Sequence, residues 1–532
     1  MKKIVLVIII LLASTLRLYK LGSNPPALYW DEASLGYNAY SILKTGHDEH
    51  GKFMPLTNFA AFGDYKPPGY IYATVPALAI FGLNEFAIRF PSAFFGILTV
   101  LTTYLISKRI FKNEIVSLLS ALFLAISPWH LQFSRGAFEA NLGLFFSTLG
   151  IYFFLMFEKE KPLMLLASIL SFIAAMYTFT GQRLFVPFIL LILFIQFKKR
   201  ILENLKIVAI SLILGAFIFW PLFKFATGTI EGRLRFDEVT IFKDLKPIEE
   251  STKYRQRENF SAISGIIHNR RIFYAREYLI HYFDAFNPAF LFTRGDANPR
   301  LSIQEVGELY YIDLPLILIG IYFLFKTKQK YRLLLIGWLL VSPLGPATAR
   351  ETPHALRMIH ILPTFQLIAA FGLYNIYQVV KFKRTLIAFT VFLLTLNFVY
   401  YLHMYYLHWP KEYSGQWQYG YKQAVMAVAP HFDKYEDIVV TKALGRPYIY
   451  FLLYTNYDPE KYQQTAQVTR DQFYFLDVEG FDKYYFVGSI DSFPKKGKTL
   501  YVTQPESAPK DSRELKIILD TSGKPVLRIS EE

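Results

Sequence analysis

The chain of 532 residues contains no cysteine. It therefore forms no disulfide, binds no metal through thiolates and uses no cysteine nucleophile. Charged side chains are scarce, at 19% of residues, compared with about 25% in a typical soluble domain. The sequence also lacks an internal repeat and a low-complexity tract. These absences exclude disulfide-stapled proteins, thiol enzymes and repeat arrays.

Apolar and aromatic residues are abundant instead, at 53% and 17% of the chain. Apolar runs of membrane-spanning length recur through the first four hundred residues. The chain is therefore predicted to be a polytopic α-helical membrane protein. We expect about eleven spans, at residues 4–20, 88–107, 115–132, 141–157, 162–180, 184–198, 204–223, 311–326, 332–346, 358–380 and 385–403.

The net charge of +15 lies largely in short loops between these runs. Basic clusters at 108–112, 159–161, 198–200, 326–332 and 381–384 fall between alternate pairs of spans. Short cytoplasmic loops are enriched in Lys and Arg, so we expect a cell-membrane protein with a cytoplasmic N-terminus and an outer C-terminus. The basic charge then reflects topology, and no nucleic-acid partner is expected.

Segment 70–83 is too short to span a bilayer, and Pro76 interrupts it. If it crossed, every later basic loop would change sides, so we expect a juxtamembrane or re-entrant helix on the outer face. The first outer loop is then 21–87, and a large outer loop covers 224–310. Together with the spans they make a transmembrane domain at 1–403.

From residue 404 the chain becomes polar and rich in tyrosine. Segments 437–440 and 484–487 carry the alternating apolar pattern of strands, and 424–429 favours a helix. Residues 404–532 are therefore expected to form a small extracytoplasmic α/β domain.

Two acids and a lysine stand out in the first outer loop. Asp31 and Glu32 are adjacent, so their side chains point in different directions. One carboxylate is expected to face the reacting atoms, and the other to orient or form hydrogen bonds. Acids in the first turn of a helix also favour its dipole, and both interpretations stay open. Lys66 precedes Pro67-Pro68, which favour an extended backbone there. A lysine held in this way suits a phosphate, although an interfacial lysine meeting lipid head groups is the commoner case.

Further candidates lie in the later outer regions. Arg135 and Glu139 have the spacing of a simple helix pair, or they supply a phosphate clamp and a second acid. The turn-rich segment 295–300 is either a plain turn or a lid from which Arg294 or Arg300 reaches a phosphate. The run 47–50, His-Asp-Glu-His, lacks metal-site spacing and is read as a solvated loop, so no metal site is predicted.

These motifs in this order resemble the lipid-linked glycosyltransferases of the GT-C superfold. The nearest likeness is to glycosyltransferase family 39, with its protein O-mannosyltransferases and bacterial aminoarabinose transferases. The resemblance covers about residues 1–400 and departs from better-known members in 224–310 and the tail. Its matching elements are Asp31-Glu32, Lys66-Pro67-Pro68, the segment 89–93 and the segment 134–141.

The resemblance implies a GT-C fold and transfer of a sugar from a polyprenyl-phosphate donor to an acceptor hydroxyl on the outer face. It implies Asp31 as the base, Lys66 as the phosphate ligand and Glu139 as the second acid. Such enzymes generally need no metal or other cofactor. The acceptor is unknown, and membrane lipids are the other expected partners.

Three alternative functions stay open, two from other classes of protein and one with a different transfer reaction. A transporter or flippase for lipid-linked sugars predicts inverted repeats and ionisable groups near the mid-membrane, whereas these acids gather at one face. A scaffold whose tail binds partners explains the tail alone. An oligosaccharyltransferase-like enzyme would transfer a preassembled glycan from a pyrophosphate-linked donor and require a metal.

Overall fold

The computed structural model describes residues 2–159, 161–470, 476–490, 493–494 and 497–532. Contacts within the chain divide it into two compact units that do not follow chain order. The helical unit comprises Met1–Leu16, Phe95–Phe133 and Ala140–Tyr401. The sheet unit comprises Arg17–Phe94, Ser134–Glu139 and Leu402–Glu532. The first outer loop therefore groups with the C-terminal tail. The predicted functional division at 403/404 stays a prediction.

Long apolar helices confirm the prediction of a polytopic membrane protein. Within the described residues, four helices are long and apolar enough to cross a membrane, or five if one bent pair is a single span. They are α4 (Glu85–Phe111), α7 (Glu139–Lys159), α10 (Leu205–Gly228), α19 (Lys383–His403, continuing to Glu412) and the pair Ala355–Ile361 with Thr364–Val379. The expected number of eleven stays a prediction.

The remaining predicted spans also form helices, which fall outside those limits of length or composition. They are α1 (Lys2–Leu18), α5 (Glu114–Ile126), α8 (Met164–Thr178), α9 (Gln182–Leu202), α15 (Asp313–Lys326) and α16 (Arg332–Val341). The short α6 (Pro128–Phe133) and α17 (Ala355–Met358) connect longer helices.

Glycine allows two of these helices to cross closely. A Cβ atom on Gly320 of α15 would lie 2.1 Å from the carbonyl oxygen of Ile368 in α18 (Thr364–Val379). A Cβ atom on Gly372 would lie 2.2 Å from the carbonyl oxygen of Leu316. Small residues that permit backbone approach are the usual packing device of membrane helices.

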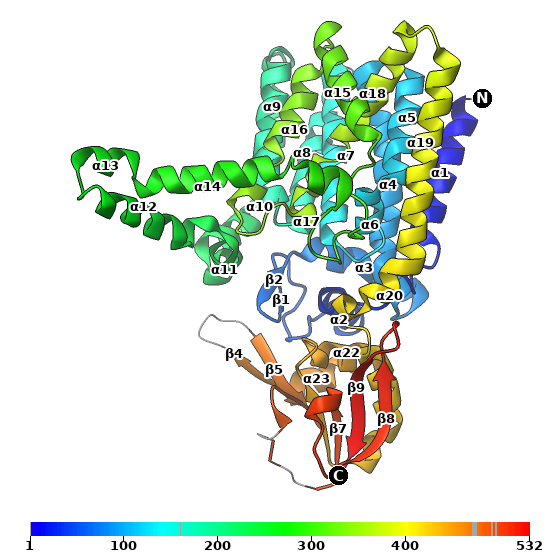
Figure 1. Cartoon of the computed structure of the whole chain (residues 1–532), viewed down its shortest axis with the longest axis vertical. Helices are drawn as coiled ribbons and strands as arrows, with labels where there is room; N and C mark the ends of the chain where they lie inside the picture. The colour runs from blue at the N-terminus through cyan, green and yellow to red at the C-terminus, as the bar shows by residue number, and fades with distance from the viewer. Residues whose placement is uncertain (1, 160, 471–475, 491–492, 495–496) are drawn as a thin grey trace. The chain divides into compact units, whose positions relative to one another are not determined.

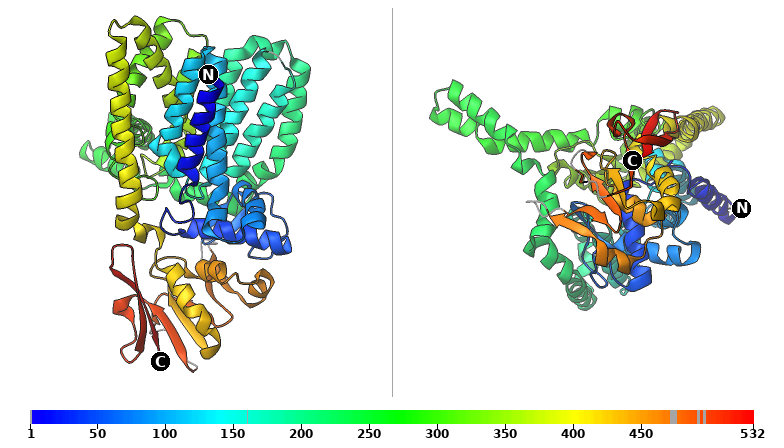
Figure 2. Two further views of the ribbon diagram at one scale, coloured as in Figure 1. Left: turned by 90° about the vertical axis from the view of Figure 1, so that its right-hand side faces the viewer. Right: turned by 90° about the horizontal axis from the view of Figure 1, so that it is seen from below.

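The large outer loop is mostly helical. It contains α11 (Ile230–Val239), η1 (Ile241–Lys243), α12 (Lys246–Arg257), α13 (Ala262–Ile267), α14 (Arg270–Asp284) and the π-helix η2 (Ala289–Thr293). Figure 1 shows α12, α13 and α14 reaching sideways, and the view from below in Figure 2 shows the same. We call residues 229–288 the arm.

The sheet unit begins with the first outer loop. Its elements are α2 (Trp30–Thr45), β1 (Phe59–Ala61), β2 (Asp64–Lys66) and α3 (Pro68–Phe81). Segment 70–83 is thus mostly helical, and α3 has only 14 residues, fewer than the roughly 20 that a span requires. Its place on the outer membrane face stays a prediction.

The tail folds around a mixed sheet of seven strands within the described residues. The strand order is β4-β5-β6-β3-β7-β9-β8, and β3 runs parallel to both of its neighbours. The strands are β3 (Asp437–Thr441), β4 (Gln467–Arg470), β5 (Leu476–Phe481), β6 (Tyr484–Val487), β7 (Thr499–Thr503), β8 (Arg513–Leu519) and β9 (Pro525–Glu531).

The burial of the two strands follows from their positions, because β3 is at the centre of the sheet and β4 is at its edge. Every residue of β3 is buried, whereas every residue of β4 is exposed. The tail helices are α20 (Trp409–Glu412), α21 (Tyr421–Val428), α22 (Pro447–Tyr454) and α23 (Pro459–Thr465). The predicted strands at 437–440 and 484–487, the helix near 424–429 and the α/β tail are confirmed.

Candidate active site

Asp31 and Glu32 are the second and third residues of α2, so both lie in its first turn. Glu32 caps this turn, because its Oε2 accepts the backbone N–H of Tyr29 at 3.3 Å. The two carboxylates nevertheless occupy different surroundings. Glu32 is fully buried, whereas the Asp31 side chain keeps 24% of its surface exposed. The helix-terminus interpretation therefore applies to Glu32, and Asp31 is the acid that stays accessible to solvent.

Glu32 forms a buried ion pair with Arg89 of α4. Two parallel bonds join them, from Nε to Oε1 and from Nη2 to Oε2, each at 2.9 Å. Glu32 Oε1 also accepts the backbone N–H of Ala137 at 2.7 Å. The guanidinium donates as well to the carbonyl oxygens of Leu21, Pro25 and Ala27. These partners give Glu32 a positioning role, and its predicted catalytic role stays untested.

Lys66 lies between two carboxylates of the same loop. Its Nζ is 2.9 Å from Asp31 Oδ1 and 3.1 Å from Asp64 Oδ2. Lys66 is the last residue of β2, and Pro67 and Pro68 open α3 immediately afterwards. The prolines favour the extended backbone that ends the strand. Because side chains alternate along a strand, Asp64 and Lys66 share one face.

The surrounding carboxylates keep Lys66 charged. Burial alone would lower the pKa of this amine, but nearby negative charges outweigh it and hold the pKa above its usual value. In order of effect these charges belong to Asp31, Asp64 and Glu139. The structure therefore brings three of the predicted residues, Asp31, Lys66 and Glu139, into one electrostatic cluster. Glu139 is half-buried at the start of α7.

The guanidinium group of Arg135 forms its hydrogen bonds with other parts of the protein. Its guanidinium donates to the carbonyl oxygens of Arg17, Tyr19 and Asn24, at 3.2, 2.8 and 2.9 Å. Its Nε also donates to the Tyr405 hydroxyl at 2.9 Å. Because α7 begins at Glu139, Arg135 lies outside that helix and the helix-pair interpretation is wrong. These bonds favour a structural role, and the predicted phosphate contact stays untested.

Arg294 and Arg300 belong to the helical unit, so their predicted contact with a phosphate in the first-loop site stays a prediction. Arg294 is exposed just after η2. The Arg300 N–H donates to Asn298 Oδ1 at 3.0 Å within a tight turn. Asp296 in the same segment is buried and accepts the backbone N–H of Ala355 at 2.6 Å. These bonds favour the turn interpretation for 295–300.

The prediction of a solvated loop at 47–50 is wrong. Asp48 and Glu49 are buried, because the tail covers this segment within the sheet unit. Glu49 accepts from Asn38 Nδ2 at 2.9 Å and from the Tyr448 hydroxyl at 3.5 Å. Burial raises the pKa of Glu49 to about 8. In the described part of the chain, no group of three or more His, Cys, Asp or Glu is arranged to hold a metal ion.

The sequence gives no role to two residues of this region, Asp64 and Arg89, although both lie in segments that stand out. The pattern Asp-x-Lys at 64–66 could have revealed Asp64, since strand periodicity places both charges on one face. Arg89 is 57 residues from Glu32, and no local pattern predicts that pairing.

Comparisons with known proteins found a matching family model and solved structures with a similar fold. Residues 7–222, which include the whole cluster, match the family model of the dolichyl-phosphate-mannose-protein mannosyltransferases. ArnT from Cupriavidus metallidurans matches with a TM-score of 0.56 and 13% identity, over 99% of this chain and 97% of ArnT. The chain has the fold of ArnT and of the other GT-C glycosyltransferases that it matches. The predicted GT-C fold is confirmed.

Two other matches are partial. The GT-C oligosaccharyltransferase AglB from Archaeoglobus fulgidus matches with a TM-score of 0.52 and 15% identity, over 85% of this chain and 63% of AglB. An uncharacterised protein of Aquifex aeolicus is 32% identical over 180 residues. That alignment covers 33% of this chain and 34% of the relative, so this chain spans about a third of its length.

We predict that Glu32→Ala destabilises the sheet unit by about 3–5 kcal/mol, because it leaves the buried Arg89 charge without its partner. Thermal unfolding of detergent-purified protein measures the loss. The double variant Glu32→Ala/Arg89→Met should recover part of the stability, since it removes both charges. A Glu32→Ala variant with unchanged thermal stability but no transfer activity would instead assign Glu32 to the chemistry.

A second prediction concerns Glu49 and pH. An unfolded glutamate ionises near pH 4.5, whereas folded Glu49 keeps its proton to about pH 8. Unfolding therefore releases a proton in this window, and Glu49 lowers stability as pH rises, by at most about 1.4 kcal/mol per pH unit. The stability of Glu49→Gln relative to wild type should increase from pH 5 to pH 8 in thermal unfolding. A difference that does not change with pH would contradict this.

Proposed function

We propose that this chain transfers a sugar from a polyprenyl-phosphate-linked donor to an acceptor hydroxyl at the outer face of the membrane. The observation that carries the proposal is the Asp31–Lys66 pair, 2.9 Å apart. It sets a partly exposed carboxylate beside a charged amine in the segment that matches the family model. One group is a base for a hydroxyl, and the other is a cation for a phosphate.

Two structural relatives that bind lipid phosphates support a lipid-linked donor. ArnT has been solved bound to undecaprenyl phosphate, in a structure with a TM-score of 0.54 to this chain. AglB has been solved with a dolichol-phosphate. Both lipids end in a phosphate, the group for which Lys66 is proposed as the ligand.

The proposed step conserves atoms and charge. Asp31 accepts the proton of the acceptor hydroxyl while that oxygen bonds to the anomeric carbon of the sugar. The bond from the anomeric carbon to the phosphate oxygen breaks, and its electrons leave with the polyprenyl phosphate. Lys66 stabilises this departing anion. Asp64 holds Lys66 in place through an ion pair at 3.1 Å, and Glu139 is proposed as the second acid.

Coverage gives the oligosaccharyltransferase-like alternative no better support. This chain covers 97% of ArnT but only 63% of AglB. We further propose a cytoplasmic N-terminus and an outer sheet unit. We also propose that activity requires no metal, and addition of EDTA tests this point directly.

We predict that Asp31→Asn lowers transfer by a factor of about 10² or more, because an amide cannot accept the proton. The assay follows release of radiolabelled sugar from synthetic polyprenyl-phosphate donors by protein in vesicles, with membrane extract as the source of acceptor. Asp433→Asn, at an exposed position of the tail, is the matched control and should retain activity. Turnover by Asp31→Asn close to that of wild type would remove Asp31 from the role of base.

We also predict that Lys66→Met lowers the rate by about 10²–10³-fold, the typical effect of removing one stabilising donor from a developing anion. It should weaken binding of the donor lipid as well, while Lys66→Arg retains part of both. Lys52→Met, at an exposed position of the same loop, is the control. Unchanged donor binding and turnover in a folded Lys66→Met variant would contradict the phosphate assignment.

A further inference from the structure

The arm carries an apolar surface that the proposed reaction does not use. It begins directly after α10, a candidate span of which only 17% is buried inside the protein. Gly228 ends α10, and Ile230 begins α11. The chain therefore enters the arm at the point where a candidate membrane span ends.

The base of the arm is fixed to other helices of the same unit. The Tyr278 hydroxyl donates to the carbonyl oxygen of Leu344 at 3.0 Å, and His281 Nδ1–H donates to that of Ala349 at 2.8 Å. Thr352 Oγ1 donates to Asp284 Oδ2 at 2.8 Å. These bonds set the direction in which α14 leaves the bundle.

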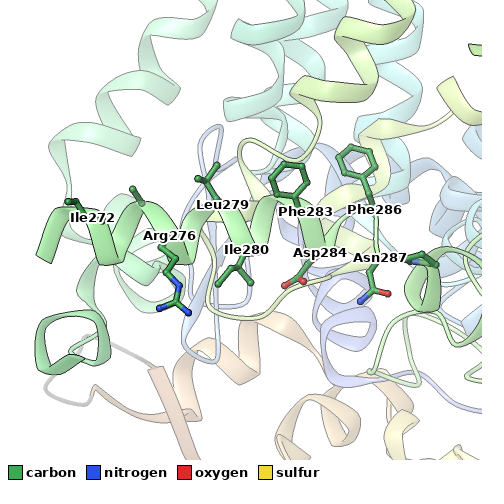
Figure 3. A pocket seen from close by; sticks show the side chains of 10 residues that line it. Ile272, Arg276, Leu279, Ile280, Phe283, Asp284, Phe286 and Asn287 are labelled. Atoms are coloured by element: carbon green, nitrogen blue, oxygen red, sulfur yellow. The ribbon is translucent and has the colours of Figure 1, made fainter. Parts of the chain in front are cut away.

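One face of α14 is apolar and exposed. Ile272, Leu279 and Phe283 expose 48%, 53% and 64% of their surface. Their spacing of seven and then four residues places them on one side of a helix. Figure 3 shows Ile272, Leu279, Phe283 and Phe286 pointing toward the side on which the helices of the bundle rise. Arg276, Ile280, Asp284 and Asn287 point the opposite way.

The tip of the arm is also apolar. In α13 and the turn before it, Phe260, Ile263, Ile266 and Ile267 are between 55% and 73% exposed. Around them the sequence is basic. Between residues 251 and 276 there are six Lys or Arg, against one acidic residue, Glu258. The six are Lys253, Arg255, Arg257, Arg270, Arg271 and Arg276.

We propose that the arm lies on the bilayer surface, with the apolar face of α14 and the tip of α13 inserted among the lipids and the basic residues at anionic head groups. Three observations support the lipid bilayer as the partner of this apolar surface. The arm starts at a membrane span, its apolar face is turned toward the side of the spans, and the charge of its distal part complements anionic lipid. Helices with this distribution of side chains settle at the interface between head groups and acyl chains.

The absence of cysteine makes a direct test possible, because each introduced cysteine is the single labelling site. Ile266→Cys and Phe283→Cys report the proposed inserted positions, and Arg276→Cys is the matched control on the opposite face. Each variant is labelled with a nitroxide and placed in vesicles of phosphatidylcholine and phosphatidylglycerol at 3:1. Electron paramagnetic resonance then compares collisions with oxygen, which concentrates in lipid, and with a water-soluble nickel chelate.

We expect labels at 266 and 283 to give a severalfold higher ratio of oxygen to nickel collisions than the label at 276. If the labels at all three positions are equally accessible to the nickel chelate, the proposal is overturned. Spin–spin broadening that disappears on dilution with unlabelled protein would overturn it too, since a second copy would then cover this face. The measurement needs no sugar donor, so its outcome is independent of the proposed transfer reaction.

The electrostatic part is tested separately with the label at 266. Replacing phosphatidylglycerol by phosphatidylcholine should reduce the insertion depth, and the triple variant Arg255→Gln/Arg257→Gln/Arg271→Gln should lose this dependence on lipid charge. Insertion that is identical in both lipids would overturn the role of anionic head groups.

Discussion

The buried ion pair between Arg89 and Glu32 is the interaction on which the first-loop site depends. Arg89 holds the first turn of α2 through Glu32 and the entering chain through the carbonyl oxygens of Leu21, Pro25 and Ala27. Glu32 also secures the 134–139 segment through the N–H of Ala137. A charge taken out of water is tolerated only when its hydrogen bonds are satisfied, and here they join three separate parts of the chain.

This arrangement assigns different tasks to two adjacent acids. Because neighbours on a helix point in different directions, fixing Glu32 in the interior turns Asp31 toward Lys66. The same logic operates on β2, where alternation puts Asp64 and Lys66 on one face and the two prolines end the strand. Nearby carboxylates favour the protonated form of a lysine, so the site presents a cation next to a partly exposed carboxylate. That combination suits the departure of a phosphate coupled to deprotonation of a hydroxyl.

Local pattern was sufficient for much of the fold and for part of the site. Apolar runs predicted the helices, alternation predicted β3 and β6, and Lys66-Pro67-Pro68 predicted an extended lysine at the start of a helix. Properties that depend on distant partners were not predictable in this way. The 57-residue separation of Glu32 and Arg89, the burial of Glu49 under Tyr448 and the occupation of Arg135 by carbonyl oxygens arise from tertiary contacts. The sequence predicts only a long loop in the region of the arm, because the helices there are short and mixed in composition.

The tail contributes directly to the surroundings of Asp31, so it is not an independent appendage. The backbone N–H of Trp30, the residue before Asp31, donates to Gln418 of the tail at 3.3 Å. Gly445 has a φ of +120°, and a Cβ atom there would lie 2.7 Å from the ring of Trp30. The Tyr450 hydroxyl donates to the carbonyl oxygen of Leu28 at 3.1 Å. A tail that supports the first turn of α2 on one side can vary elsewhere without altering the acid itself. The tail residues that contact Leu28 and Trp30 are therefore part of the support of the first-loop site.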